Sequence, residues 1–246
     1  LSALDANTTG GSNTGIGAGA LGGNTTASNN TAVGKNAMLA NTTGAENTAV
    51  GQGALDANTT ADNNTAIGRE ALGANTTGES NTAVGTGSLD ANTTASNNTA
   101  VGHAALGANT TGHSNVSLGK SSMEANTTGD SNTAVGFYAF AANTTGTNNT
   151  AVGYAALDAN TTANNNTAVG SSALSLNTTG TDNVAVGRNA ADSITSSSYN
   201  VAIGGNALGA ATTGDGRNVA IGQGAMGSAT TGAYNVGIGE GALGAL

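Results

Sequence analysis

Cysteine, proline and tryptophan are all absent from this 246-residue chain. Without cysteine, disulfides cannot stabilise the fold, and cysteine usage gives no indication of the compartment. Charged residues make up only 8% of the chain and aromatic residues only 2%, so a conventional core under a charged surface is not expected. The fold must therefore be stabilised by something other than disulfides or aromatic packing.

Basic residues are also scarce, since five Lys and Arg stand against 14 Asp and Glu and the net charge is −9. Binding to a phosphate backbone needs clustered Lys and Arg, so we expect no nucleic-acid partner. No apolar run approaches the roughly 20 residues of a membrane span. We therefore expect no direct membrane insertion by this segment.

The residue types that carry catalysis do not converge in this sequence. An enzyme needs several titratable groups in one pocket, whereas the two histidines, His103 and His113, stand at different positions of a repeat. There is no Cys, no histidine pair and no Asp-rich glycine loop for a metal. We expect no enzyme activity, no metal and no cofactor.

What the chain does contain is a short repeat that runs from end to end. The pattern Asn47-Thr48-Ala49-Val50-Gly51 returns in nearly the same form at 64–68 and again at 81–85, which defines a 17-residue period. The apolar residue before the glycine falls at Ile16, Val33, Val50, Ile67, Val84, Val101, Leu118, Val135, Val152, Val169, Val186, Ile203, Ile221 and Ile238. These 14 repeats contain one slip of a single residue. A short, uninterrupted repeat predicts one stacked array, with residues 1–246 as a single domain.

A second apolar column lies five residues further on. It consists of Leu4, Leu21, Met38, Leu55, Leu72, Leu89, Leu106, Met123, Phe140, Leu157, Leu174, Leu208, Met226 and Leu243, with Ala191 as the exception. Helices are disfavoured because Gly, Thr, Asn and Val are poor helix formers. In a short strand, Thr48 and Val50 would point to one side, and Asn47 and Ala49 to the other. Because Val116 replaces the threonine in another repeat, we expect the Thr and Val side to face inward.

Asparagine and glycine frame each of these strands. The glycine indicates a corner with positive φ or a close backbone approach, and the asparagine indicates side chains that stack on their copies in neighbouring coils. The predicted asparagine ladder includes Asn47, Asn64, Asn81, Asn98 and Asn132, and the predicted corner glycines include Gly51, Gly68, Gly85, Gly102 and Gly136. The fold class is therefore all-β, a repetitive parallel β-solenoid of about 14 coils. Because each coil has a thin core, we expect an oligomer, with a trimer favoured over a monomeric solenoid.

The strings Asn-Val-Ala-Ile-Gly at 200–204 and 218–222 resemble the head repeats of YadA-like trimeric autotransporter adhesins. Similar strings occur in the shafts of phage tail fibres. The resemblance covers all 14 repeats and implies a left-handed parallel β-roll, three copies of which pack through their apolar faces into a homotrimer. The repeat here is longer than in the adhesin heads, because the Asn-Thr-Thr turn adds residues.

The position after each corner glycine is the most variable column. Together with one neighbour it includes a candidate contact face, consisting of Lys35, Arg69, His103, Lys120, Phe137, Tyr138, Tyr154 and Arg188. Aromatic and cationic side chains in line could contact a host surface glycan or a protein receptor. The simpler interpretation is an outward corner that tolerates large side chains.

The Asn-Thr-Thr segments allow two further interpretations. Each is an N-glycosylation sequon, and the candidate sites include Asn41, Asn58, Asn75, Asn92 and Asn109, although turn chemistry also explains the motif. Regularly spaced threonines on a flat β-face can order water, so an ice-binding solenoid is a second possible function. However, the pair Thr42-Thr43 lies in a turn, and neighbouring strand residues face opposite ways, which disfavours that function.

The sequence therefore predicts an extracellular structural and adhesive fibre or rod that attaches to a surface by multivalent contacts. Copies are expected to assemble end to end into filaments through exposed terminal strands. A phage or tailocin tail-fibre shaft, on a virion surface instead of a cell surface, is the alternative. Leu1 and Leu246 stand in mid-repeat, so we expect a segment of a longer chain.

Overall fold

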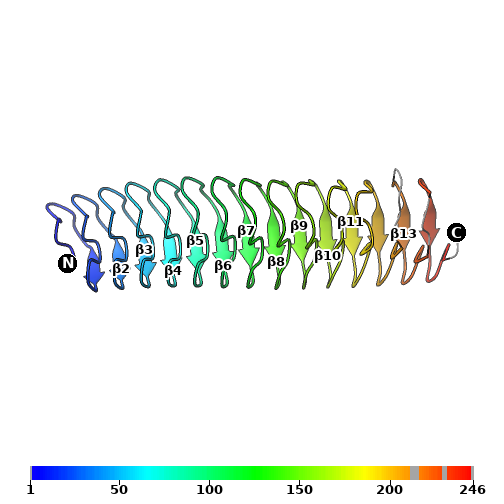
Figure 1. The fold of residues 1–246 in the computed structure, drawn as a ribbon, viewed down its shortest axis with the longest axis horizontal. Helices are drawn as coiled ribbons and strands as arrows, with labels where there is room; N and C mark the ends of the chain where they lie inside the picture. The colour runs from blue at the N-terminus through cyan, green and yellow to red at the C-terminus, as the bar shows by residue number, and fades with distance from the viewer. Residues whose placement is uncertain (1, 211–215, 229–231, 245–246) are drawn as a thin grey trace. The chain divides into compact units, whose positions relative to one another are not determined.

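The computed structural model describes residues 2–210, 216–228 and 232–244, so Leu1 and Leu246 lie outside it. The chain falls into two compact units, Leu1–Thr128 and Gly129–Leu246, which are described separately here as the first and second units. Each unit contains seven three-residue strands that run parallel, and no helix occurs within the described ranges (Figure 1). This confirms the predicted all-β solenoid and its repeat.

The strands follow one another at regular intervals in both units. The first unit holds β1 (Thr14–Ile16), β2 (Thr31–Val33), β3 (Thr48–Val50), β4 (Thr65–Ile67), β5 (Thr82–Val84), β6 (Thr99–Val101) and β7 (Val116–Leu118). The second unit holds β8 (Thr133–Val135), β9 (Thr150–Val152), β10 (Thr167–Val169), β11 (Val184–Val186), β12 (Val201–Ile203), β13 (Val219–Ile221) and β14 (Val236–Ile238).

The register of the strands follows the repeat of the sequence. Thr48 of β3 pairs with Thr65 of β4, the equivalent position of the next repeat, so each column of the sequence becomes a column in space. At the single slip, Val201 of β12 pairs with Val219 of β13, although the chain between them is longer by a single residue. The strands stay aligned there, so the extra residue is accommodated outside them.

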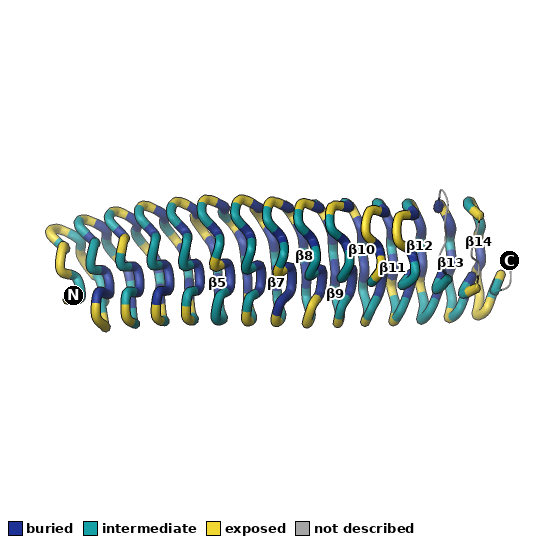
Figure 2. The backbone as a smooth tube through the Cα atoms, in the orientation of Figure 1, coloured by how far each residue is buried: buried dark blue, intermediate teal, exposed yellow. Residues whose placement is uncertain are grey.

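The two faces of the strands are the reverse of the predicted ones. Ala49 and Asn47 are fully buried, whereas Thr48 is half-buried and Val50 is 36% exposed (Figure 2). The prediction that Thr and Val face inward is therefore wrong. A β-carbon at Gly237, an inward strand position, would lie 2.9 Å from Cγ of Met226. Met226 would have to shift even for a methyl group at Gly237, so the inward position is tight, and the larger β-branched residues point outward.

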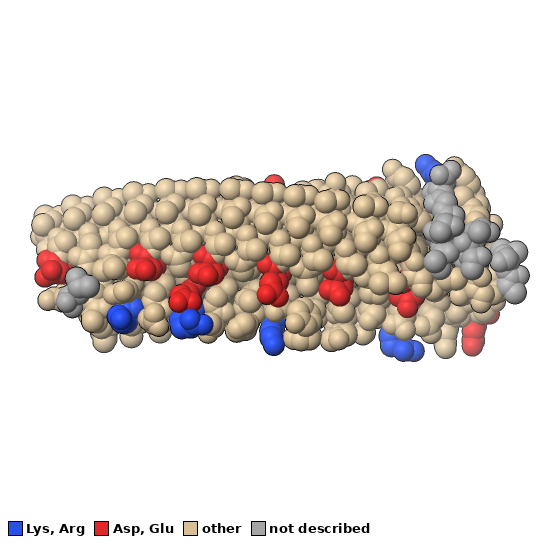
Figure 3. All heavy atoms as spheres, viewed as in Figure 1, with Lys and Arg blue, Asp and Glu red and all other residues tan. Residues whose placement is uncertain are grey.

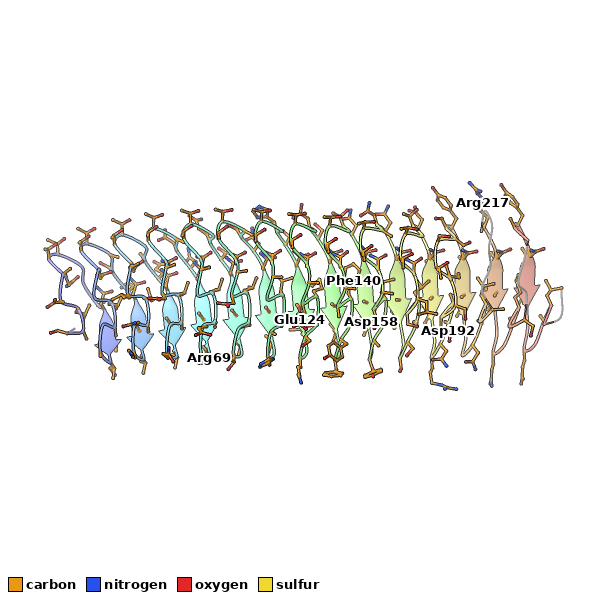
Figure 4. All side chains as sticks on the ribbon, in the orientation of Figure 1. Arg69, Glu124, Phe140, Asp158, Asp192 and Arg217 are labelled. Carbon is orange, nitrogen blue, oxygen red and sulfur yellow. The ribbon has the colours of Figure 1, made fainter. Side chains whose placement is uncertain are left out.

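These outward side chains, the first and third residue of every strand, form what we call the outer sheet face. The interior of each coil is filled from other positions. In the coil of β3, for example, the interior contains Ala49, Ala54, Leu55, Asn58 and Ala61, all buried. Phe140 takes the place of the leucine in the coil of β8, where it points inward (Figure 4).

The second apolar column, which we call the leucine column, is buried except at its end members Leu4 and Leu243, and it has an unusual backbone conformation. Its members, from Leu4 to Leu243, all have φ between +46° and +56°. This left-handed region costs an ordinary L-residue about 1 to 2 kcal/mol. The coil therefore stores backbone strain at its best-buried side chain, where burial of the leucine offsets it.

Candidate functional site

The corner glycines bring the chain out of the strand and onto an exposed edge. The predicted set, Gly51, Gly68, Gly85, Gly102 and Gly136, has φ between +136° and +141°. A β-carbon at Gly51 would lie 2.3 Å from the carbonyl oxygen of Gly68 in the next coil. Both the positive φ and the close backbone approach thus require glycine here.

Asparagines at the start of the strands form a buried ladder within each unit, which we call the strand ladder. The backbone N–H of Asn64 donates to Oδ1 of Asn47 at 2.9 Å, and Nδ2 of Asn47 donates to the carbonyl oxygen of Ala61 at 2.8 Å. Asn81 and Asn98 continue the ladder in the first unit, and Asn132 is bonded to Asn149 in the same way in the second. Each buried amide is therefore satisfied by a neighbouring coil.

A second ladder, which we call the turn ladder, was not predicted. It consists of the asparagine of each Asn-Thr-Thr segment. Nδ2 of Asn58 donates to Oδ1 of Asn41 at 2.9 Å and to the carbonyl oxygen of Ala61 at 3.1 Å. The Ala61 carbonyl thus accepts hydrogen bonds from both ladders. The signal in the sequence was that this asparagine recurs without variation from Asn7 to Asn177.

The turn ladder bears directly on the candidate glycosylation sites. All five of them, Asn41, Asn58, Asn75, Asn92 and Asn109, are fully buried. In each one, Nδ2, the atom that would carry a glycan, donates one hydrogen bond to the preceding asparagine and one to a carbonyl later in the same turn. A glycan on the folded coil would replace one of the two N–H donors, so at least one of these bonds would be lost at a fully buried atom.

The threonines of the same segments have separate roles. Oγ1 of Thr42 donates to the carbonyl oxygen of Thr59 in the next coil at 3.0 Å, so this hydroxyl connects coils. Thr43, the next residue, is exposed. The Asn-Thr-Thr segment is therefore a structural connection between coils, with one threonine left facing solvent.

The candidate contact face lies where the sequence placed it, on exposed corners. Its members, Lys35, Arg69, His103, Lys120, Phe137, Tyr138, Tyr154 and Arg188, are all exposed. Seven of them directly follow a corner glycine, and we call that repeat position the corner column. Figure 3 shows the basic side chains of the first unit along one edge of the viewed face.

The corner column is held at regular intervals by backbone hydrogen bonds. In the second unit, the carbonyl of Phe137 accepts from the N–H of Ala155 at 3.1 Å, and that of Tyr154 accepts from the N–H of Ser172 at 2.9 Å. Consecutive members of the column therefore lie one coil apart, about 4.8 Å. Three aromatic side chains are brought together there, and the cationic ones stand in separate coils.

Aromatic contacts join Phe137, Tyr138 and Tyr154, which we call the aromatic cluster. The ring centroids of Phe137 and Tyr138 are 4.2 Å apart with an interplanar angle of 61°. Those of Phe137 and Tyr154 are 5.9 Å apart, and the rings are within 20° of parallel. In the first unit, by contrast, Arg69 is paired by its Nη1 with Oε2 of Glu70 at 3.0 Å.

Within each unit, acidic side chains lie in a row on the viewed face (Figure 3). Four of them, Asp56, Asp90, Asp158 and Asp192, directly follow the leucine column. Partial burial raises the pKa of each carboxyl above its ordinary value of 3.8. For Asp90, the Glu70 carboxylate raises the pKa further and Arg69 opposes it.

One further cluster was missed by the sequence interpretation. Cζ of Arg217 lies 5.0 Å from the ring centroid of Tyr199 and 5.4 Å from that of Tyr234, so the guanidinium sits between two rings. Figure 4 shows Arg217 at the margin of the view away from Asp158 and Asp192. The signal was positional, because all three residues precede an asparagine of the strand ladder.

The surface has little relief. No pocket was found in residues 2–210, 216–228 and 232–244, and those residues contain no group of three His, Asp or Glu that could hold a metal ion. The described part of the chain also has no helix long and apolar enough to cross a membrane. Any ligand of these residues must therefore bind to an open surface.

The fold and this surface define the class: a β-solenoid repeat protein whose coils are joined by two buried asparagine ladders and whose exposed corners vary. Comparisons with protein-family models, with curated proteins and with solved structures found no match to this chain. Its function is therefore argued from the faces of the coils.

Proposed function

We propose that this protein is a structural and adhesive β-solenoid, which assembles with copies of itself through the outer sheet face and attaches to a surface through its corner column. The observation that carries the proposal is the composition of the outer sheet face. Its side chains are Thr, Val, Ile and one Leu, with no charge in any strand. Exposed apolar stripes of this kind mark interaction sites.

The outer sheet face is most apolar in the second unit. From β11 to β14, both outward positions of every strand are Val or Ile. Val186 is 36% exposed and Ile203 is 39% exposed, although β11 and β12 are flanked by other strands. A second copy would cover these side chains with an identical, equally spaced face. Three copies around a common axis is the arrangement that the resemblance to autotransporter heads implies.

Adhesion would follow from the repetition of the coils. A ligand with many equivalent groups can engage several coils at once, which gives avidity that a single weak contact lacks. An extracellular location, on a cell or on a virion, rests on the same resemblance. A tail-fibre shaft would use the outer sheet face in the same way and remains the alternative.

Sedimentation equilibrium over a range of concentrations tests the assembly. We expect about 69 kDa, three times the chain mass of 23.1 kDa. Ile203→Lys, which places a charge on the outer sheet face, should dissociate the oligomer. Gln223→Lys places the same charge on an exposed corner and should leave the mass unchanged. A wild-type mass of 23.1 kDa at every concentration would refute the assembly.

The outward threonines favour one second function, the ordering of water on an ice surface. In β1 to β6, a threonine column lies beside a Val and Ile column on the outer sheet face. Each column thus repeats at about 4.8 Å between strands, and the threonine column lies about 6.6 Å from the Val and Ile column along them. Thermal hysteresis of the monomeric protein would support this function, and Thr82→Lys should abolish the effect. Inactivity at high micromolar concentration would dispose of it.

A further inference from the structure

The fold does not require aromatic side chains at the positions of the aromatic cluster, because other coils carry small or polar residues there. The chain has only four Tyr and two Phe, and four of the six lie in two adjacent coils, where Phe140 is buried and the other three are in contact on the surface. Phe137, Tyr138 and Tyr154 remain 38%, 39% and 57% exposed despite their mutual contacts. Large exposed rings carry a cost in water, so burial by a ligand would stabilise them.

Next to the aromatic cluster, the corner column carries small side chains. Ser171 follows Tyr154 by one coil and is exposed, and Ala155 and Ser172 next to the column are half-buried. Arg188 comes one coil later, about 10 Å from Tyr154 along the column. Backbone bonds from Ser172 to Tyr154 and from Asn189 to Ser171 hold this spacing. Small side chains therefore separate the Tyr154 ring from the Arg188 guanidinium, and we call this short stretch of surface the step.

The groups around this step combine an apolar surface with hydrogen-bonding groups. Arg188 is exposed, and in the described residues its guanidinium has no carboxylate within ion-pair distance. The Ser171 hydroxyl can donate and accept, and the carboxylate of Asp158, in the coil of Tyr154, accepts hydrogen bonds. Figure 4 shows Asp158 and Asp192 on the viewed face of the second unit.

We propose that Phe137, Tyr138 and Tyr154, together with Ser171 and Arg188, bind a neutral oligosaccharide chain with flat, equatorially linked sugar rings. The C–H groups on the face of such a ring are apolar and match the electron-rich face of an aromatic side chain. Its hydroxyl groups meet the Ser171 hydroxyl and the Arg188 guanidinium at the step. The proposal names the ligand class of the contact face and rests on the adhesive part of the proposed function.

Three observations favour this ligand over others. An anionic polysaccharide would meet a chain of net charge −9, and the Asp158 and Asp192 carboxylates lie in the same coils as Tyr154 and Arg188. A second copy of the chain is better matched by the outer sheet face, which repeats in every coil, whereas the cluster occupies only two. An extended, neutral chain also suits a surface without a pocket.

Calorimetric titration of the full chain with cellohexaose tests the proposal. We expect measurable binding, weakened at least tenfold by Tyr154→Ala and by Arg188→Gln. Arg217→Gln removes the same charge at an exposed position outside the corner column and should leave the affinity unchanged. Hexagalacturonate, a carboxylated probe of similar length, should bind more weakly than cellohexaose.

The proposal is overturned if cellohexaose does not bind at millimolar concentration, if Tyr154→Ala binds as well as wild type, or if hexagalacturonate binds more tightly. Because Tyr154 is exposed, circular dichroism should show an unchanged fold in the variant. Sedimentation separates this proposal from self-assembly: a loss of oligomer in Tyr154→Ala would assign the cluster to a contact between copies and refute saccharide binding. A monomeric wild type that still binds cellohexaose would refute assembly alone.

Discussion

At the corner glycines, a single methyl group decides whether two coils can stack. Gly85 has a φ of +137°, and a β-carbon there would lie 2.4 Å from the carbonyl oxygen of Gly102. Gly85→Ala should therefore destabilise the fold by about 3 kcal/mol or more, from strain and overlap together. Urea unfolding measures this loss.

Gly11→Ala is the control for that measurement. A β-carbon at Gly11 would have no neighbour within 4 Å, so we expect a change below about 0.5 kcal/mol. Equal losses in the two variants would show that backbone contact at the corner is not what requires glycine.

Strain in the left-handed region predicts a stabilising substitution. Ala104 has a φ of +55°, and other coils carry glycine at this position, as at Gly53 and Gly87. Ala104→Gly should stabilise the fold by about 0.5 to 1 kcal/mol, because relief of the strain exceeds the entropy cost of glycine. The adjacent Ala105→Gly, at a fully buried alanine without positive φ, should instead destabilise it. Opposite shifts of Tm confirm the assignment, and shifts of the same sign contradict it.

Positive φ could be predicted from the sequence at some residues and not at others. Corner glycines could be predicted because only glycine appears there, and glycine is what a positive φ selects. The positive φ of Leu55 could not be predicted, because an apolar column indicates burial and gives no information about φ. The φ of +50° at Leu55 follows from closing the coil, a tertiary requirement that overrides local preference.

At the scale of the element, the turn ladder depends on amide donors. Nδ2 of Asn75 donates to Oδ1 of Asn58 at 3.1 Å and to the carbonyl oxygen of Gly78 at 3.0 Å. Asn75→Asp replaces this donor by an oxygen that faces two acceptors in a buried site. We expect a loss of about 3 to 5 kcal/mol, as for other uncompensated buried charges.

Hydrogen exchange should locate that loss. Each coil of a repeat protein contacts mainly its neighbours, so amides near Asn75 should lose protection first. Asn97→Asp is the matched control, because Asn97 is exposed and aspartate tolerates its φ of +63°. Loss of protection spread evenly over the first unit would contradict a local role for the ladder.

Elements were predicted better than their faces. The period and the alternating pattern were sufficient for parallel strands and for the strand ladder. The predicted orientation is wrong because it rests on the exchange of Thr for Val at the Thr48 position as a sign of burial, whereas this position is only half-buried and points outward. The space inside the coil decides the orientation instead. The small side chain of Ala49 fits against the leucine column, whereas the larger side chain of Val50 points outward. The turn ladder was hidden because Asn-Thr-Thr is equally typical of turns and of glycosylation sites.

The molecule as a whole carries many more negative than positive charges. The net charge is −9, and the structure describes a single ion pair, between Arg69 and Glu70. Carboxylates next to the leucine column lose part of their hydration on folding, with few cations to compensate them. Folding therefore works against ionisation of these groups, and stability should depend on pH in a definite direction.

The pKa values of Asp56, Asp90, Asp158 and Asp192 are raised in the folded state by burial. The folded chain thus binds more protons than the unfolded chain between the ordinary value of 3.8 and the raised values. Stability should fall as pH rises through that window and should be greatest at its acidic end. Thermal unfolding should give a higher Tm at about pH 4.5 than at pH 7. Asp158→Asn should raise the Tm at pH 7 and reduce the difference, whereas Asp5→Asn, at an exposed residue, should leave the difference unchanged. A wild-type Tm that falls on acidification would mean that the folded state favours these carboxylates in their charged form.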